Sequence, residues 1–423
     1  MSKVFLAELV PLNNKGEEAI IRGIVDVVFN GKDDVDIAVL DHVEKAEIRY
    51  GIHVFPYSWL YPKIFGNSLV NRMRGLLYMF LIRFGYKGVA SILLKNPVDE
   101  RKCMVDWFLD SDYIFLGHDG VFSSLDYPII SCAKKRNLNV GIFGCGLGIP
   151  KSIFSRFLVK PVYRKVIEKV DFAFFRETSS FTFMKQLSAY NTKVKLVPDP
   201  AFGMEYSRNE LIRSYLPGFN IDDERLIVCV TVCENSVVFR QSFLHIVDQK
   251  SKEAFHISFL AALFDNVIME NNAVVVFLPH VIGKGRNSDV IVALDVYNEM
   301  KYKDSAVVLN RDLGSKTLKG IIAKADFVIA ERTHSAIGAA SATTPFVMLT
   351  NKHDLRSIEI FRDSCLAGDL LIDMNQDVES VSKKINERIA CRASIKRDLE
   401  VIRQFHQIQL KQTGKEIISC KDN

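Results

Sequence analysis

The sequence lacks paired cysteine motifs. Its eight cysteines are irregularly spaced, and none belongs to a C-x-x-C pair. Structural zinc sites commonly use such pairs, and disulfide frameworks are typical of short secreted domains. We therefore expect reduced thiols in a cytoplasmic protein, with neither a metal site nor a disulfide framework.

Long apolar runs are also absent. A membrane-spanning helix needs about 20 consecutive apolar residues, and the nearest candidate, residues 75–82, is closed by Arg74 and Arg83. Near the start of the chain, Glu8 interrupts what would be the apolar core of a signal peptide. These observations predict a cytoplasmic protein without a membrane span.

The charge is nearly balanced. The chain has 55 Lys and Arg residues and 50 Asp and Glu residues, which gives a formal net charge of +5. Nucleic-acid-binding domains usually concentrate their basic residues on one face, whereas here they are scattered. We expect no nucleic-acid partner and only a weak preference for anionic ligands.

What the chain does contain is a repeated alternation of short apolar runs with helical stretches. Each apolar run is followed by Gly, Ser or Thr, as in strand–turn–helix units. Such repeats predict α/β domains whose parallel sheets are covered on both faces. Strands are predicted at residues 4–10, 36–40, 113–116, 140–144, 172–175, 226–231, 273–278, 306–309, 327–330 and 346–349.

A chain of 423 residues is too long for one ordinary core and predicts two. We expect two Rossmann-like domains that face a cleft, over residues 1–205 and 206–377. Residues 378–423 are predicted to form a charged helical tail that packs back on the first domain.

Residues 57–95 are rich in aromatic and basic side chains. Two interpretations stay open for this segment. It could be a peripheral membrane contact near a lipid-linked substrate, or a pair of helices packed on the sheet with their bases in water. The helical spacing of the aromatics favours the second.

The strongest candidate site follows the predicted strand at 327–330. There Glu331 and Arg332 precede a helix of small residues, with Thr333 or Ser335 as its N-cap. Backbone N–H groups at a helix start favour a phosphate or carboxylate, and a guanidinium binds the same groups. His334 adds a proton carrier. The alternative is that Arg332 pairs with a nearby acid and that His334 is a packing residue.

The first half of the chain repeats this pattern more weakly. Arg176 ends a predicted strand and precedes a Ser/Thr-rich helix start, although it could simply pair with Glu177. After the first strand, the segment that contains Asn14, Gly16 and Glu17 suits either helix capping or ligand contact. Glycine-bearing loops are predicted at residues 117–120 and 143–148; the second lacks the dinucleotide-binding spacing, so no cofactor is expected.

These stretches, in this order, resemble the polysaccharide pyruvyl transferase family. The resemblance covers residues 4–352 and rests on six matches: Asn14-Lys15-Gly16-Glu17, the loop at 117–120, the glycines at 144–148, Arg176-Glu177-Thr178-Ser179-Ser180, Asp199-Pro200-Ala201, and Arg332-Thr333-His334 with the helix up to Pro345. The chain departs from the family pattern at Glu17, His118, Asp119 and Thr333.

The resemblance implies a GT-B-like fold and transfer of pyruvate from phosphoenolpyruvate to a sugar of a surface polysaccharide, as a cyclic ketal. The acceptor would be a sugar or a lipid-linked oligosaccharide, bound at the cytoplasmic side or the inner face of the plasma membrane. Arg176, Arg332 and His334 would form the catalytic set. Substrate contacts are predicted at Thr333, Ser335, Asn14, Gly16, Glu17, His118, Asp119 and Gly146.

The predicted mechanism needs no metal. His334 would protonate the methylene carbon of the donor, and Arg176 and Arg332 would bind its anionic groups. Asp119, His118 and Glu17 are all candidates for the base that activates the sugar hydroxyl. Two alternatives stay open: a nucleotide-sugar glycosyltransferase on the same fold, and a non-catalytic member of a glycan-assembly cluster.

Overall fold

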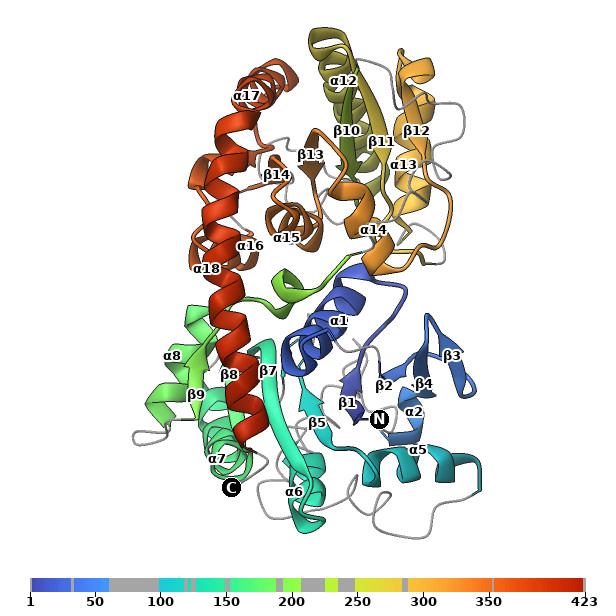
Figure 1. The fold of residues 1–423 in the computed structure, drawn as a ribbon. Coiled ribbons are helices and arrows are strands. Elements are labelled where there is room, and N and C mark those ends of the chain that lie inside the picture. The colour runs from blue at the N-terminus through green and yellow to red at the C-terminus, as the bar shows by residue number, and fades with distance from the viewer. Residues whose placement is uncertain are drawn as a thin grey trace. The chain divides into compact units, whose positions relative to one another are not determined.

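The computed structural model (Figure 1) shows an α/β chain. It describes residues 2–31, 34–60, 99–117, 121–122, 127–147, 149, 153–187, 193–206, 225–234, 248–283, 288–351 and 354–420. Within the predicted segment 57–95, only residues 57–60 are described, as the short helix α2 (Tyr57–Leu60). His118 and Asp119 lie outside the described residues.

The chain divides into two compact units. Unit 1 contains Met1–Leu12, Ile20–Pro200 and Gln409–Asn423, and unit 2 contains Asn13–Ala19 and Ala201–Ile408. These units differ from the predicted ranges in three segments. Residues 201–205 belong to unit 2, although they were predicted to end the first domain. Residues 13–19 belong to unit 2 although the chain around them belongs to unit 1, and the C-terminal tail is divided between the units at residue 408.

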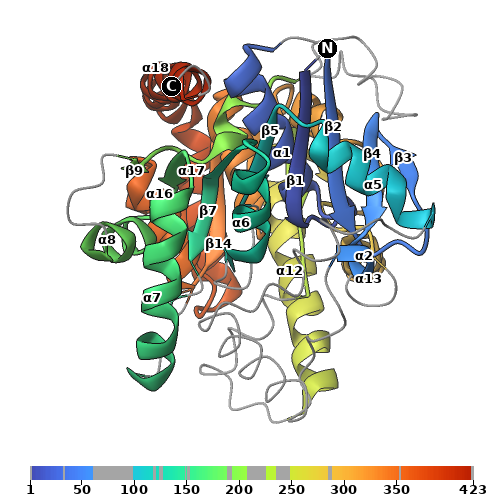
Figure 2. The same cartoon turned by 90° about the horizontal axis from the view of Figure 1, so that it is seen from below.

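Unit 1 is built on a nine-stranded sheet in the order β3-β4-β2-β1-β5-β7-β8-β9, with β6 paired to β7. Every pairing is parallel except that of β3 with β4. In Figure 2 the labelled strands of this sheet, β3, β4, β2, β1, β5, β7 and β9, follow this order. Their bounds are β1 Ser2–Leu9, β2 Val35–Asp41, β3 Glu47–Arg49, β4 Ile52–Pro56, β5 Tyr113–Leu116, β6 Val121–Phe122, β7 Asn139–Leu147, β8 Phe172–Phe175 and β9 Val194–Leu196.

The helices of unit 1 connect these strands. Parallel neighbours require crossover connections, which are almost always right-handed. Helix α1 connects β1 to β2 and covers one face of the sheet. From β5 to β9 the chain adds strands toward the other edge, so α6, α7 and α8 cover the opposite face. The helices are α1 Lys15–Phe29, α5 Asp99–Leu109, α6 Tyr127–Lys135, α7 Ile153–Lys169 and α8 Thr178–Leu187.

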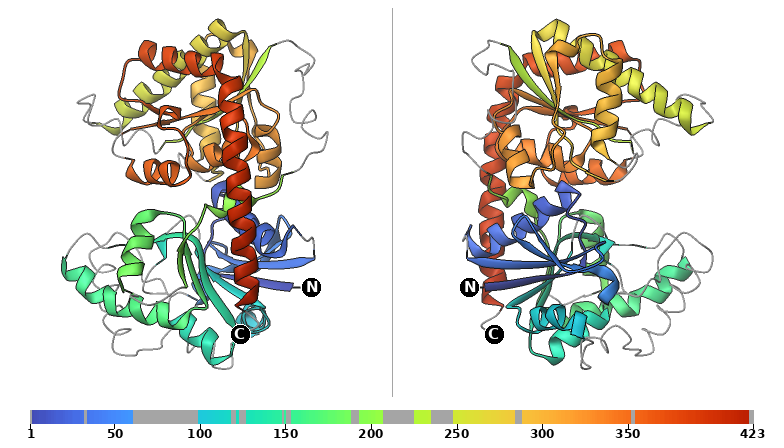
Figure 3. Two further views of the ribbon diagram at one scale, coloured as in Figure 1. Left: turned by 60° about the vertical axis from the view of Figure 1, so that its left-hand side comes forward. Right: turned by 90° about the vertical axis from the view of Figure 1, so that its right-hand side faces the viewer.

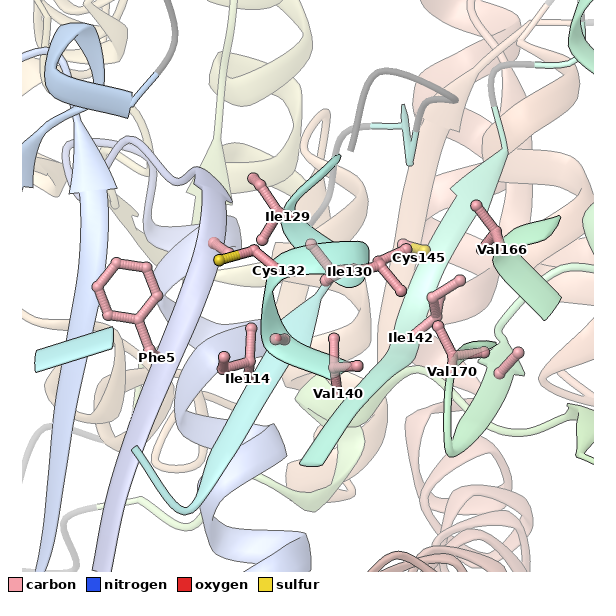
Figure 4. Packing of buried hydrophobic residues seen from close by; sticks show 14 of the residues in the cluster. Phe5, Ile114, Ile129, Ile130, Cys132, Val140, Ile142, Cys145, Val166 and Val170 are labelled. Atoms are coloured by element: carbon pink, nitrogen blue, oxygen red, sulfur yellow. The ribbon is translucent and has the colours of Figure 1, made fainter. Parts of the chain in front are cut away.

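Apolar side chains from the sheet and its helices form a continuous core in unit 1 (Figure 4). Phe5 and Ile114 come from neighbouring strands, Ile129 from α6 and Val166 from α7, and all four are fully buried. Burying one such side chain contributes about 1.5–3 kcal/mol. The central strands are apolar on both faces, which is why they read as continuous apolar runs in the sequence.

The end of the last helix, α18 (Arg392–Ser419), packs against α1 within unit 1. Gly414 permits this contact, because a Cβ atom at this position would lie 2.2 Å from the backbone oxygen of Val27. We expect Gly414→Ala to lower the free energy of unfolding by roughly 1–3 kcal/mol, as overpacking does. Chemical denaturation measures this change.

Gly338 supplies the matched control for that prediction. It also lies inside a helix, but a Cβ atom there would meet only the Ile322 side chain, at 3.6 Å. Alanine has the higher helix propensity by about 1 kcal/mol, so Gly338→Ala is expected to leave stability unchanged or raise it. Equal losses in the two variants would contradict the close packing of Gly414.

Unit 2 contains a six-stranded, all-parallel sheet in the order β12-β11-β10-β13-β14-β15. The chain builds outward from β10 to β12, then starts again at β13 on the other side of β10. The point between β10 and β13 is therefore the topological switch point of the sheet. The strands are β10 Leu226–Thr231, β11 Ala273–Phe277, β12 Ala306–Val308, β13 Phe327–Ala330, β14 Phe346–Thr350 and β15 Leu371–Asp373.

Helices lie on both faces of this sheet (Figure 3). The reversal at the switch point places α12 and α13 on one face and α14 and α15 on the other, since crossovers are right-handed. Contacts between α12 and α13 and between α14 and α15 agree with this division. The helices are α12 Gln249–Asn271, α13 Asp289–Glu299, α14 Ser315–Ile322, α15 Thr333–Ala342, α16 Leu355–Asp363 and α17 Val378–Ala390.

The predicted fold class, two Rossmann-like α/β domains, is confirmed. All ten predicted strands are present, and those at 113–116, 172–175, 226–231 and 327–330 have the predicted bounds. None of the described helices combines the length and apolar character that a membrane crossing requires.

Candidate active site in unit 2

Arg332 and His334 lie at the switch point of unit 2. The strand β13 ends at Ala330, Arg332 occupies the N-cap position of α15, and His334 lies in the first turn of that helix. Ligands of open α/β sheets bind outside the carboxyl ends of the strands at this point. The sheet topology therefore places both predicted residues where a ligand is expected.

The Arg332 guanidinium is bound by a carboxylate from α13. Its Nε donates to Asp289 Oδ2 at 3.2 Å, and its Nη2 donates to Asp289 Oδ1 at 2.5 Å. Burial lowers the pKa of Arg332. Cys233, Asp289 and Glu331 raise it by more than burial lowers it, so the net shift of the pKa is upward. Burial raises the pKa of Asp289, and the neighbouring Arg332 only partly offsets this increase. Arg332 is thus a permanent cation.

The neighbouring residue, Glu331, has a different role. Its Oε2 accepts a hydrogen bond from the backbone N–H of Cys233 at 2.8 Å, and its Oε1 lies 3.3 Å from His256 Nε2. Glu331, Cys233 and His256 are all buried. Glu331 therefore ties the end of β13 to the end of β10 and holds the two strand ends of the switch point together.

Residues 13–15 pair with the turn that precedes α13. The Lys15 N–H donates to the His280 carbonyl at 2.7 Å, and the Ile282 N–H donates to the Asn13 carbonyl at 2.9 Å. Asn14 also caps α1, since its Oδ1 accepts from the Gly16 N–H at 3.0 Å. The capping interpretation of Asn14 is thus observed directly, and the segment it belongs to lies in unit 2.

The Lys15 side chain is almost fully buried beside two acids. Its Nζ lies 2.7 Å from Asp312 Oδ1 and 3.7 Å from Glu18 Oε2. Glu18 also accepts a hydrogen bond from the Ser315 N–H at 3.1 Å, at the start of α14. A carboxylate at that position suits the positive end of the helix.

Gly16 lies directly against the imidazole of His334. A Cβ atom at this position would lie 2.8 Å from His334 Nδ1 and 2.9 Å from its Cγ. Any larger residue would therefore have to displace the ring. Gly16, predicted as a substrate contact, is in this structure a packing surface for His334.

A second histidine, His280, lies near the same group of residues. Burial, together with the nearby Arg332, His334 and Lys15, lowers its pKa to about 3, although the hydrogen bond with the Leu278 carbonyl acts in the opposite direction. His280 is therefore neutral at physiological pH. It therefore cannot donate a proton from a charged state.

A small cavity of about 20 Å³ lies among these side chains, with room for about one water molecule. Its polar lining residues are Lys15, His280, Ser315, Lys319 and His334. The Lys319 ammonium also donates to the Met204 carbonyl. The lining carries two lysines, of which Lys15 is paired with Glu18 and Asp312.

The predicted N-cap of α15 was wrong. Arg332 occupies that position, and its side chain makes no capping hydrogen bond. Thr333 Oγ1 instead lies 2.8 Å from Ser357 Oγ. Ser335 is fully buried, and its hydroxyl has no hydrogen-bond partner among the described residues.

In unit 1, Arg176 is held inside the protein. Its side chain is fully buried, and its Nη1 donates to Asp199 Oδ2 at 2.6 Å. Asp199, not Glu177, is therefore the acid paired with Arg176. Arg176 follows β8, which is not a switch-point strand, because the order of this sheet reverses between β1 and β5.

The prediction of a glycine-bearing loop at 143–148 was wrong. β7 continues to Leu147, so Gly144 and Gly146 lie within the strand. A Cβ atom at Gly146 would lie 2.4 Å from Glu177 Oε1. The space beside Gly146 is thus filled by a side chain of the same unit.

The structure describes only one of the three remaining predicted substrate contacts. Glu17 is buried, and His118 and Asp119 lie outside the described residues. No group of three or more His, Cys, Asp or Glu residues that could hold a metal ion occurs in the described part of the chain.

Sequence reasoning missed Asp289, His280 and Lys319. Asp289 is separated from Arg332 by 43 residues, and no local pattern connects them. The available signal was positional: Asp289 begins a helix that follows the strand β11, and His280 lies between them. Both therefore come from the carboxyl end of a strand near the switch point.

The model of the polysaccharide pyruvyl transferase family matches residues 14–353. The chain belongs to that family. The matched range begins at Asn14 and includes Arg332 and His334. No curated protein matches the chain in sequence.

Solved structures show the same fold as this family member at low sequence identity. The α,α-trehalose 6-phosphate synthase from Burkholderia multivorans is 11% identical, with a TM-score of 0.53 and 99% of each chain covered. The UDP-GlcNAc 2-epimerase from Neisseria meningitidis, bound to UDP-GlcNAc, is 8% identical, with a TM-score of 0.51 and 99% of each chain covered. These likenesses establish a GT-B fold and no more.

Proposed function

We propose that the protein transfers pyruvate from phosphoenolpyruvate to two hydroxyls of a polysaccharide sugar, as a cyclic ketal. The observation that carries this proposal is the placement of Arg332 and His334 at the switch point of unit 2, in a chain of the polysaccharide pyruvyl transferase family. Since the donor carries a phosphate and a carboxylate, it fits a site built around a permanent cation.

The proposed reaction divides into two steps. His334 donates a proton to the methylene carbon of the donor, and a sugar hydroxyl attacks the adjacent carbon. A second hydroxyl then displaces phosphate and closes the ketal. One hydroxyl proton replaces the one that His334 gave, and the other leaves with phosphate. Arg332 stabilises the anionic groups during both steps.

Two further residues, His280 and Arg176, are left out of the proposed catalytic set. His280 is excluded as the proton donor because it is neutral at physiological pH. Arg176 is not included in the donor site, since it is buried against Asp199. The base for the sugar hydroxyl stays a choice among Glu17, His118 and Asp119. We place the reaction in the cytoplasm, and membrane contact through residues 57–95 stays a prediction.

Thermal unfolding with and without phosphoenolpyruvate tests the donor. A ligand that binds only the folded state stabilises it by about 2.7 kcal/mol at 100 times its Kd. We expect phosphoenolpyruvate to raise the Tm of the native protein and to have no effect on Arg332→Ala, which lacks the cation. Arg362→Ala, at an exposed arginine of α16 in the same unit, should respond like the native protein.

The same experiment separates the alternatives. A Tm shift with a uridine or guanosine diphosphate sugar, and none with phosphoenolpyruvate, would instead support a nucleotide-sugar glycosyltransferase. A shift with phosphoenolpyruvate but no phosphate release with any acceptor extract would favour a non-catalytic member of the family.

A further inference from the structure

Four hydrogen bonds converge on the carboxylate of Asp289. Besides the two from Arg332, its Oδ2 accepts from the backbone N–H groups of His280 at 3.0 Å and Val281 at 2.8 Å. The Asp289 side chain is 2% exposed, whereas that of Arg332 is 20% exposed. The carboxylate is therefore buried, and the Arg332 side chain that it binds is partly exposed.

The contact uses one particular edge of the guanidinium. Asp289 binds the side edge, formed by Nε and Nη2. A guanidinium has five N–H donors in a fixed plane, so the terminal edge, formed by one N–H of Nη1 and the second N–H of Nη2, points away from Asp289. That terminal edge can form two parallel hydrogen bonds with a phosphate or carboxylate.

Asp289 also reaches the neighbourhood of His334 indirectly. It holds the backbone of His280 and Val281, and the same turn pairs with Asn13 and Lys15. The next residue, Gly16, lies against the His334 ring. One carboxylate therefore supports both the guanidinium and the segment that packs on the imidazole.

We propose that Asp289 is a positioning residue, which fixes the side edge of Arg332 so that the terminal edge is presented to the anionic groups of the donor. This inference rests on the proposed function, because it takes phosphoenolpyruvate as the anion. The opposite role, in which Asp289 weakens donor binding, makes a different prediction. If Asp289 merely neutralised Arg332, its removal would strengthen donor binding.

The variant Asp289→Asn distinguishes these roles. Asparagine has one acceptor oxygen, so it cannot serve both the backbone N–H groups and the guanidinium, and its NH2 group would oppose a donor of Arg332. We expect the Kd for phosphoenolpyruvate to rise roughly 10- to 100-fold, as for other misplaced binding groups. Isothermal titration with phosphoenolpyruvate alone measures the change.

Asp265 is a matched control in the same unit. Its buried carboxylate accepts hydrogen bonds from the backbone N–H groups of Lys301 and Tyr302 at 2.9–3.1 Å and binds no arginine among the residues that the structure describes. Asp265→Asn should lower the Tm to a similar extent as Asp289→Asn, without weakening donor binding. Equal weakening in the two variants would overturn the positioning role and indicate general destabilisation.

A double-mutant cycle with Arg332→Lys keeps the inference testable if Asp289→Asn is poorly stable. Lysine keeps the charge but has no side edge to hold, so adding Asp289→Asn to Arg332→Lys should change the Kd by less than twofold. A full effect in that background would show that Asp289 does not act through Arg332. If the native protein does not bind phosphoenolpyruvate, the proposed function fails first; if it does and Asp289→Asn binds equally or more tightly, only this inference fails.

Discussion

Turnover is expected to be lost in His334→Gln while donor binding is kept. Glutamine can still form hydrogen bonds at this position but has no proton to transfer to the methylene carbon. General acid catalysis typically contributes a factor of about 10²–10⁴, so kcat for phosphate release should fall by that factor. The Tm shift with phosphoenolpyruvate should stay close to the native value, because Arg332 is intact.

His280→Gln is the comparison for that experiment. His280 lines the same cavity but is neutral, since burial lowers its pKa to about 3. We expect a much smaller loss of kcat than in His334→Gln. If the two variants lose equal activity, or if His334→Gln stays fully active, His334 is not the proton donor.

The second large effect is expected from Gly16→Ala. The added methyl group would lie within 3 Å of the His334 ring, so either the ring or the segment at 13–19 must move. A displacement of about 1 Å can cost a factor of roughly 10² in rate. We therefore expect kcat to fall by about that factor, with a smaller change in the KM for phosphoenolpyruvate.

Gly368→Ala controls for the substitution itself. Gly368 lies in unit 2, and a Cβ atom there would meet nothing within 4 Å, so this variant should keep native kcat. Native turnover in Gly16→Ala would mean that the His334 ring does not have to be held in the observed place.

The elements of the fold were predictable because their signals are local. Strand β13 is a run of four apolar residues, all buried, and its bounds match the prediction. Parallel strands covered on both faces produce such runs regardless of their neighbours. By contrast, β3, β9 and β15 were missed, and each has only three residues. β12 is equally short but was predicted, because it lies in the apolar run at 306–309.

The site was predictable only in part. Arg332 and His334 were recognised because a strand, a cation and a small-residue helix are adjacent in sequence. Their partners depend on the order of strands in the sheet, which local patterns do not contain: Asp289 is on α13, and Gly16 is near the other end of the chain. The same limit explains why Glu177 was considered as the partner of Arg176, whereas the structure shows Asp199.

The placement of residues 13–19 in unit 2 has a consequence for how such a chain can diverge. A fragment that begins at Ala201 would lack the Lys15 cation that binds Asp312 and the backbone that pairs with His280 and Ile282. A single recombination crossover that exchanges the second half between two homologues would therefore combine residues 13–19 of one parent with residues 280–282 of the other. Hybrids should tolerate such exchange best when residues 13–19 are inherited from the same parent as residues 280–282.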